Sequence, residues 1–405
     1  TALAPGKIHK IKLPKFSSVE KWVVDTDAWI PTLEDYKNIY LTELSLPGAW
    51  YSLGKDENAY QATGSTATVL WNAGIRAFAV ECRTVTSGRY ASDDIIGVSV
   101  SGTQSQGGFL GSGDWCYGGD RISGVISSIA AAIKPDEFGV LVLSYADGGD
   151  GGHRPEDYAY FIEGIQNEII DSEVNNIYSE AITSSTTVFD VLGQLIIKIN
   201  VDANIPIGSY KNDMNALISY NPFLKQLTAA DYTTPLFSKM YWSSWNNSYK
   251  THTKTYNSTD FMWCFSSANR TQPDPTGNGT AVEGLPTYAQ RKTALATMIQ
   301  HSKDISANST HNVWFYFNAG GTQTNSASAG TTAAGARTFA STMNTWLLDV
   351  IKLKANGGID TNGVLGAKGA HIESDPSPLG IVMFNQCTGD NATYHGADII
   401  KEIIE

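Results

Sequence analysis

The chain has 405 residues, 42% of them hydrophobic and 17% charged, and carries a formal net charge of -12, as an ordinary globular protein does. This negative balance argues against nucleic acid as a partner, because proteins bind its phosphates mainly through Lys and Arg. No stretch approaches the roughly 20 apolar residues that a membrane-spanning helix needs, so no transmembrane segment is predicted.

Short apolar, β-branched runs alternate with helical patterns from one end of the chain to the other. This alternation predicts an α/β protein built of repeated βα units around a parallel sheet. Eight strands are expected, which is enough to close a (β/α)8 barrel of the TIM type. The predicted strands are residues 39–46, 75–82, 95–101, 139–145, 192–200, 237–241, 313–318 and 379–385.

Helical periodicity lies between the predicted strands. An apolar stripe at helical spacing marks the segment 121–133, as a helix packed on a sheet requires. The connection between the second and third strands is short and shows no convincing helix, which departs from a regular barrel. The predicted helices are residues 59–71, 121–133, 156–170, 212–227, 288–303, 338–354 and 397–404.

Two segments are poor in structure-forming residues. Residues 269–284 are rich in Pro, Gly, Thr and Asn, and residues 319–335 consist largely of Gly, Ser, Thr and Ala. They follow the sixth and seventh strands, so we expect two long loops at the carboxyl-terminal face, where barrel enzymes carry their functional loops. The expected organisation is an amino-terminal extension, 1–30, packed on a single barrel domain, 31–405.

The compartment is suggested by the start of the chain and leaves the cysteines undecided. The sequence begins at Thr1 without an apolar signal region, as a chain trimmed after a signal peptide would, so we expect an extracytoplasmic protein. The cysteines have no CxxC spacing, which argues against a zinc site. They form either one or two disulfides or buried free thiols. The four are Cys82, Cys116, Cys264 and Cys387.

Four motifs, in order, resemble the phosphatidylinositol-specific phospholipase C family. Residues 44–52, L-S-L-P-G-A-W-Y-S, are similar to its signature S-x-P-G-T-H-D-S, and residues 72–83 are similar to its second-strand motif x-x-G-I-R-x-x-D-I-R. Residues 122–145 resemble its helix followed by x-x-E-x-V-I-L-S-L, with Glu137 in register. Residues 378–404 resemble its last strand and helix. The resemblance implies a TIM barrel.

The same resemblance implies a chemistry for which this chain lacks the expected residues. The family cleaves a phosphodiester with a neighbouring inositol hydroxyl as nucleophile, using one histidine as general base and another as general acid. The first histidine position is Trp50, whose indole cannot accept a proton, and the next position is Tyr51. The second histidine position is Ser101, whose hydroxyl has no useful pKa for acid catalysis.

Three further family positions have also changed. The acidic position of the second strand is Ala79, and the position that is Arg or a calcium-binding Asp in the family is Glu81. Near the end of the last strand, Asn385 stands where many members have Asp. We therefore predict no catalytic residue and no resident cofactor; calcium is the one ion that the family suggests.

Several residues near the predicted strand ends have two interpretations. Aromatic side chains there either pack loops over the barrel mouth or form a platform for a sugar or polyol ring. Glu81 either pairs with Arg76 or Arg83, or remains as a ligand or acceptor. His395 either caps the last helix or acts as an unrelated catalytic acid. The aromatic candidates are Trp50, Tyr51, Trp115, Tyr117 and Tyr145.

The Gly-rich stretch after the fourth strand carries Asp147, Asp150 and His153. It either holds a cation or forms a solvated turn, since it lacks the pattern of an EF-hand loop. The candidate binding residues are Trp50, Tyr51, Glu81, Ser101, Trp115, Tyr145 and Asp147.

Three functions follow from these observations. The first is a barrel of the phosphoric diester hydrolase family that has lost cleavage and binds a small polyol, a sugar or a phospholipid headgroup. The second is an active hydrolase that uses relocated groups such as Glu81, Asp147, His153 or His395. The third is a scaffold whose long loops contact another protein.

Overall fold

The computed structural model describes an eight-stranded sheet and the helices beside it. The predicted helix 212–227, the predicted strand 237–241 and the expected extension 1–30 lie outside the described residues. The structure describes residues 39–53, 60–87, 90–98, 121–145, 165, 167–180, 182, 185–200, 243–244, 250–251, 262–265, 270–271, 287–289, 291–292, 295, 313–323, 333–355 and 379–404.

Parallel strands follow one another in the order of a barrel. Along the sheet the order is β5-β4-β2-β1-β12-β10-β8, and each neighbouring pair is parallel. The first strand therefore lies beside the last, as a ring of βα units requires. The strands are β1 (Ser45–Ala49), β2 (Ala77–Ser87), β4 (Gly139–Tyr145), β5 (Leu195–Asn200), β8 (Met262–Phe265), β10 (Val313–Asn318) and β12 (Gly380–Phe384). This confirms the predicted α/β class and a parallel sheet whose strands follow the order of a barrel.

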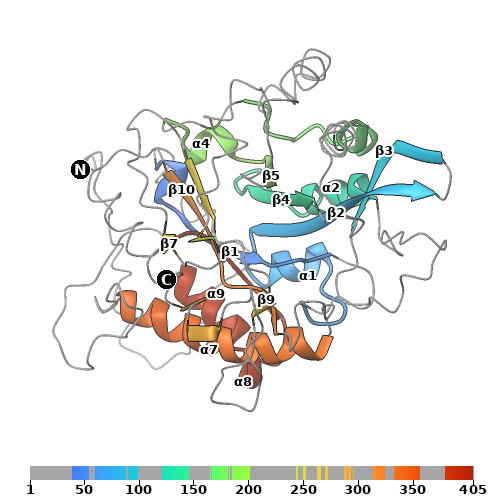
Figure 1. Ribbon diagram of the computed structural model, residues 1–405. Helices are drawn as coiled ribbons and strands as arrows, with labels where there is room; N and C mark the ends of the chain where they lie inside the picture. The colour runs from blue at the N-terminus through green and yellow to red at the C-terminus, as the bar shows by residue number, and fades with distance from the viewer. Residues whose placement is uncertain are drawn as a thin grey trace, which may run out of the picture.

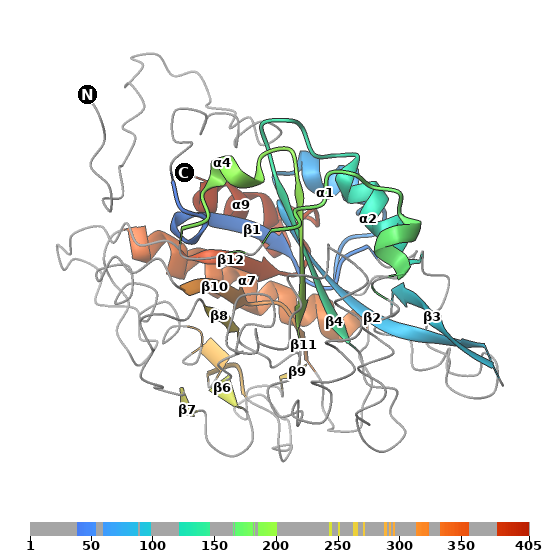
Figure 2. The same cartoon turned by 90° about the horizontal axis from the view of Figure 1, so that it is seen from above.

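The irregularity between the second and third predicted strands is a β-hairpin. β3 (Tyr90–Val98) runs antiparallel to β2, with Cys82 opposite Val98 and Ser87 opposite Tyr90. The prediction of a parallel third strand at 95–101 was wrong, because a two-residue connection can only reverse the chain and a parallel crossover needs a dozen residues or more. Figures 1 and 2 both show the far end of this ribbon extending away from the helices.

The remaining strand boundaries differ from the prediction at local breakers. The first strand begins later than expected because residues Leu41–Glu43 form a 3-10 turn, η2. It then continues through Pro47 and Gly48, which pair with Val382 and Met383 of β12. β5 begins at Leu195 because Gly193, with φ +73°, ends the preceding turn. β8 was not predicted.

Helices lie beside the sheet in two groups (Figure 1). α7 packs with α8, α9 and β11, while α1 packs on α2. In α2, the predicted apolar stripe is confirmed at Ile122, Val125, Ile126 and Ile129, all buried. No described helix is long and apolar enough to cross a membrane. The helices are α1 (Ala67–Asn72), α2 (Ile122–Ala130), α4 (Val188–Val191), α7 (Ala333–Ala355), α8 (Asn391–Tyr394) and α9 (Gly396–Ile404).

Two hydrophobic cores lie on the two faces of the strands. Along β2, Ala77 and Ala79 belong to one cluster, whereas Phe78 and Val80 belong to the other. The first cluster joins side chains from six neighbouring strands on one face of the sheet. The second packs the outer face against α2, α7 and α9. This alternation is what a barrel requires, because successive side chains of a strand point to opposite faces.

Short strands occur within and beside the predicted loops. β9 (Arg270–Thr271) and β11 (Thr322–Gln323) pair in parallel, with Thr322 opposite Arg270. The segments after β8 and after β10 are therefore joined to each other. β6 (Ser243–Ser244) and β7 (Lys250–Thr251) form a separate antiparallel pair. Residues 319–321 form the turn between β10 and β11, and the rest of both predicted loops lies outside the described residues, apart from the start of α7.

Candidate functional site

The carboxyl ends of the parallel strands, called the mouth below, hold the predicted site. Trp50 follows β1 directly, and its backbone N–H donates to the Phe384 carbonyl at 2.9 Å, which extends the contact between β1 and β12. Its side chain is only 1% exposed. The ring stacks on that of Tyr51, with centroids 4.1 Å apart, and Tyr51 meets Tyr60 edge-on. Trp50 thus lies where the family resemblance places a histidine, as a buried packing residue.

The turn after β10 closes over the Trp50 ring. A Cβ atom added to Gly320 would overlap ring and Cβ atoms of Trp50, so only glycine permits this approach. The Asn318 Oδ1 accepts from the Gly320 N–H at 2.9 Å, and the Ala319 N–H donates to the Met383 carbonyl at 2.8 Å. The backbone of this turn is therefore fixed against both Trp50 and β12.

Buried amides connect the strand ends around Trp50. Gln61 donates to the carbonyls of Trp50 and Phe384, at 2.9 and 3.0 Å, and accepts from the Cys387 N–H at 3.0 Å. Asn385 accepts from the Gly321 N–H at 3.1 Å and donates to the Gly321 carbonyl at 2.6 Å. The Asn385 side chain thus bonds both the N–H and the carbonyl of Gly321, as the backbone of a neighbouring strand would. At the position where the family has Asp, this chain has a structural amide.

A buried arginine supports the same turn. The Arg291 Nη2 donates to the carbonyl oxygens of Asn318, at 3.2 Å, and Gly320. Its guanidinium lies over the ring of Phe339, with Cζ 5.0 Å from the centroid. Burial lowers the pKa of Arg291 to about 9 and raises that of the neighbouring Tyr288 to about 12. Arg291 lies in the predicted helix 288–303, and its side chain was not singled out from the sequence.

The opposite half of the mouth is formed by the ends of β2, β4 and β5. Glu81 lies opposite Ser144, and Ser144 lies opposite Asn200, so three polar residues share one register position. The position two residues earlier holds Ala79, Val142 and Lys198. Lys198 is 1% exposed, and burial lowers the pKa of its amine to about 7. Lys198 is the one charged residue of β5, whose sequence is L-I-I-K-I-N, and this was the signal in the sequence for a buried amine.

The other predicted site residues divide into two groups. Ala79 is fully buried in the interior core, and its methyl group offers no acid or base. Tyr145 ends β4, opposite Cys82. Ser101, Trp115, Tyr117, Asp147, Asp150 and His153 lie outside the described residues, so the structure does not bring them to the mouth or exclude them from it.

Of the two arginines suggested as partners of Glu81, Arg76 forms an ion pair with Glu137, and the side chains of Glu81 and Arg83 lie outside the described part. Arg76 precedes β2, at its amino end, and its Nη2 contacts Glu137 Oε1 at 2.9 Å with both side chains fully buried. The other carboxylate oxygen accepts from the Trp71 indole at 3.1 Å, and the guanidinium lies over that indole ring, 4.2 Å from its centroid. Glu81 lies five residues further along β2, toward the mouth. Arg76 and Glu137 are both motif residues of the family resemblance.

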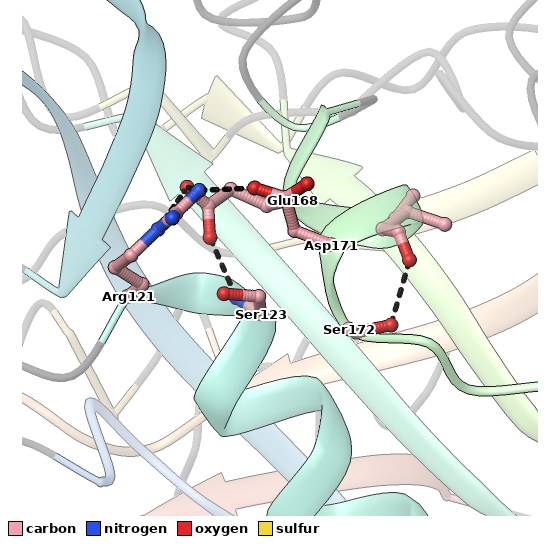
Figure 3. A network of polar contacts seen from close by, with 6 residues as sticks. Arg121, Ser123, Glu168, Asp171 and Ser172 are labelled. Carbon is pink, nitrogen blue, oxygen red and sulfur yellow. Dashed lines mark hydrogen bonds and ion pairs between the residues drawn. The ribbon is translucent and has the colours of Figure 1, made fainter.

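A second charged network fixes a helix terminus. Figure 3 shows Arg121, whose Nε and Nη2 donate to one oxygen of Glu168 at 3.0 and 2.9 Å. The other Glu168 oxygen accepts from the Ser123 N–H, in the first turn of α2, at 2.8 Å. A carboxylate at this place satisfies a free backbone donor and interacts favourably with the helix dipole. This network is therefore structural.

His395 occupies a capping position, as one of its two interpretations expected. It is the C-cap of α8, with φ 55°, and its backbone N–H donates to the Asn391 carbonyl. Its imidazole Nδ1 lies 3.6 Å from a carboxylate oxygen of Asp398 in the following helix. Among the described residues no group of three or more His, Cys, Asp or Glu side chains could hold a metal ion.

The cysteines whose side chains are described are free thiols. Cys82 and Cys387 are both buried cysteines outside any disulfide. Burial raises the pKa of Cys387 well above its usual value, so the thiol stays protonated. For these two residues the free-thiol alternative is correct; the side chains of Cys116 and Cys264 are outside the described part.

Comparison with known proteins connects this geometry to one fold. No protein-family model matches the sequence, and no curated protein matches it. A solved variant of the phosphatidylinositol-specific phospholipase C from Staphylococcus aureus matches with a TM-score of 0.51 and 14% identity, covering 94% of this chain and 96% of that chain. A second structure of that protein, with pentafluoro-Phe incorporated, gives a TM-score of 0.50 and 14% identity, covering 94% and 97%.

At this level of identity the likeness establishes the fold and leaves the chemistry to the residues of the site. Both matches extend over nearly the whole of each chain, as the four sequence motifs do. The chain has the α/β-barrel fold of phosphatidylinositol-specific phospholipase C.

Proposed function

We propose that this protein is a phospholipase C-like barrel without phosphodiesterase activity, which binds a small polyol, a sugar or a phospholipid headgroup at its mouth. The observation that carries the proposal is Trp50. At the position that the resemblance assigns to the general base, the indole is buried against Gly320 and Tyr51 and has no basic nitrogen. The extracytoplasmic location expected from the sequence is part of the same proposal.

The amides around Trp50 support the loss of catalysis. Asn385 uses both side-chain atoms on the backbone of Gly321, and Gln61 uses both of its atoms on the ends of β1 and β12. A general acid or base needs a proton that exchanges near the working pH, which an amide does not supply. In this half of the mouth the described side chains hold the backbone together.

We assign the ligand to the other half of the mouth. Glu81, Ser144 and Asn200 share a register position at the ends of β2, β4 and β5, and Lys198 lies one inward position below them. Carboxylate, hydroxyl and amide groups together both donate and accept hydrogen bonds, as the hydroxyls of a polyol require. Tyr51, which is partly exposed beside Trp50, offers an aromatic face between the two halves.

The proposal is tested by assaying turnover and binding separately. We expect no hydrolysis of phosphatidylinositol vesicles, glycerophosphoinositol or bis-nitrophenyl phosphate, with or without calcium. We expect saturable heats when myo-inositol or glycerophosphoinositol is titrated into the protein. Glu81→Gln weakens that binding, whereas Glu402→Gln, on the outer helix α9, leaves it unchanged.

Two results would contradict this function. Turnover of any of the three esters that Glu81→Gln abolishes would establish an active hydrolase with relocated groups. Absence of saturable binding by every polyol and headgroup tested would favour the scaffold hypothesis instead.

A further inference from the structure

Arg291 is a buried cation for which the described residues provide no anion. Its side chain is 2% exposed, and no carboxylate forms an ion pair with it in the described part of the chain. Nη2 uses the two carbonyl oxygens of the turn after β10. Nε and Nη1 are buried and have no hydrogen-bond acceptor among the described residues.

This arrangement is unfavourable unless another group completes it. A buried charge is costly unless it is paired and hydrogen-bonded, and each buried donor that lacks an acceptor adds its own desolvation penalty. Burial lowers the pKa of Arg291 only to about 9, so the guanidinium is still charged at neutral pH. Deprotonation therefore does not remove the cost.

The neighbouring polar groups are also donors. The Asn318 side chain is fully buried; its Oδ1 accepts from the Gly320 N–H, and its Nδ2 has no acceptor among the described residues. The Tyr288 hydroxyl, one turn before Arg291, donates to the Gln323 side chain at 3.0 Å. The turn thus gathers three buried donor atoms, on Arg291 and Asn318, and its carbonyl acceptors are already engaged.

We propose that Arg291 and Asn318 form a binding site for a phosphate group beneath the turn that follows β10. A guanidinium presents planar donors that match the oxygens of a phosphate, and the Asn318 amide adds a donor from the strand end. The group comes either from free inorganic phosphate or from a phosphate ester. This site lies on the β10 side of Trp50 and goes beyond the polyol-binding function proposed above.

Phosphate titration tests the site. Isothermal titration of inorganic phosphate at constant ionic strength, with chloride as the balancing anion, gives a saturable heat for the natural sequence, and phosphate raises the Tm. Arg291→Met lowers the affinity by about tenfold or more, as the loss of a charge-assisted hydrogen bond predicts.

A second variant covers the case in which Arg291→Met does not fold. Asn318→Asp retains an oxygen for the Gly320 N–H and replaces the amide donor with a carboxylate oxygen, so it repels phosphate and abolishes the titration heat. Arg121→Met is the matched control, because that arginine already contacts two carboxylates, and it leaves phosphate binding unchanged.

The source of the phosphate is separated by a competition arm. If glycerophosphoinositol displaces inorganic phosphate and binds more tightly, the site serves an ester; if it does not compete, the site serves the free anion. No saturable heat for the natural sequence, or equal affinity in Asn318→Asp, would overturn the proposal and assign the donors to ordered water. Ester turnover in the activity assays would defeat the proposed function and leave this site standing.

Discussion

Two arginines are buried in the described part of the chain, one at each end of the barrel, and they differ in what neutralises them. Arg76, at the amino end, contacts Glu137 and stacks on Trp71. Arg291, at the carboxyl end, stacks on Phe339 in a similar way, but its hydrogen bonds go to backbone carbonyls. Within one fold, the amino end completes its own charges, while the carboxyl end contains a cation that its described neighbours do not neutralise.

The comparison separates the framework from the site. In barrels of this kind the amino-terminal face contributes to stability, whereas the carboxyl-terminal face carries function. The family motifs retained here, with Arg76 and Glu137, include a buried ion pair below the strands. The replaced positions, Trp50 and Asn385, lie at the mouth. Arg76 and Glu137 thus hold the framework together, whereas Trp50 and Asn385 pack the backbone of the mouth.

The amino-terminal ion pair should give the largest effect. Glu137→Gln leaves the Arg76 charge buried without a carboxylate and is expected to lower the free energy of unfolding by about 3–5 kcal/mol. Chemical denaturation followed by circular dichroism measures the loss. Glu402→Gln, which removes the partner of Lys352 at 3.7 Å on the outside, should cost no more than about 1 kcal/mol. Equal losses in both variants would contradict the framework role of Glu137.

The packing of Trp50 should give the next largest effect. Gly320→Ala forces a methyl group into the indole and is expected to cost about 1–3 kcal/mol, as overpacking does. The cost should shrink when the same change is made in a Trp50→Ala background, because the ring atoms that the methyl group meets are then absent. A double-mutant cycle of unfolding free energies measures this coupling. Strict additivity would show that the turn does not rest on Trp50.

Restoring the family's carboxylate at the last strand should also destabilise the mouth. In Asn385→Asp an oxygen replaces the amide nitrogen that donates to the carbonyls of Gly321 and Ala336. The expected cost is about 1–3 kcal/mol at neutral pH. It should decrease as the pH falls and the new carboxyl is protonated, because that form can donate again. Unfolding measured from pH 4 to 7 tests this, and a cost that grows toward low pH would be evidence against it.

Lys198 should give a smaller, pH-dependent effect. Burial lowers its pKa from 10.5 to about 7, so the unfolded chain binds more protons between these values. The contribution of Lys198 to the free energy of unfolding therefore rises with pH across this window, by at most about 1.4 kcal/mol per pH unit. The natural sequence should gain stability relative to Lys198→Met from pH 7 to 10. The exposed Lys134→Met serves as the control, and parallel curves for Lys198→Met would refute the burial effect.

Sequence periodicity predicted the elements that bury one continuous face. The stripe of Ile122, Val125, Ile126 and Ile129 predicted α2 because its spacing matches a helix on a sheet. The boundaries failed where tertiary contacts override local preference. Pro47 and Gly48 read as strand breakers, yet they lie inside β1 because β12 pairs with them.

The site was less predictable than the fold. The resemblance marked Trp50 and Asn385 as replaced positions, but whether an indole is a ligand platform or a packing group depends on Gly320, which is 270 residues away in the chain. Arg291 gave no signal, since an arginine on a helix is normally exposed and only the backbone carbonyls of a distant turn show that it is buried.

The pairing of β1 with β12 has a consequence for folding during synthesis. Ser45 pairs with Gly380, and Gln61 bridges Trp50 to Cys387, so the first strand finds its neighbour only after nearly the whole chain has been synthesised. Contacts of such long sequence separation form slowly. A ribosome-bound chain shorter than about 385 residues leaves one edge of β1 without its partner, and such edges invite association with other chains. Truncation at the carboxyl terminus should therefore reduce the yield of folded protein, whether or not it removes a residue that binds ligand.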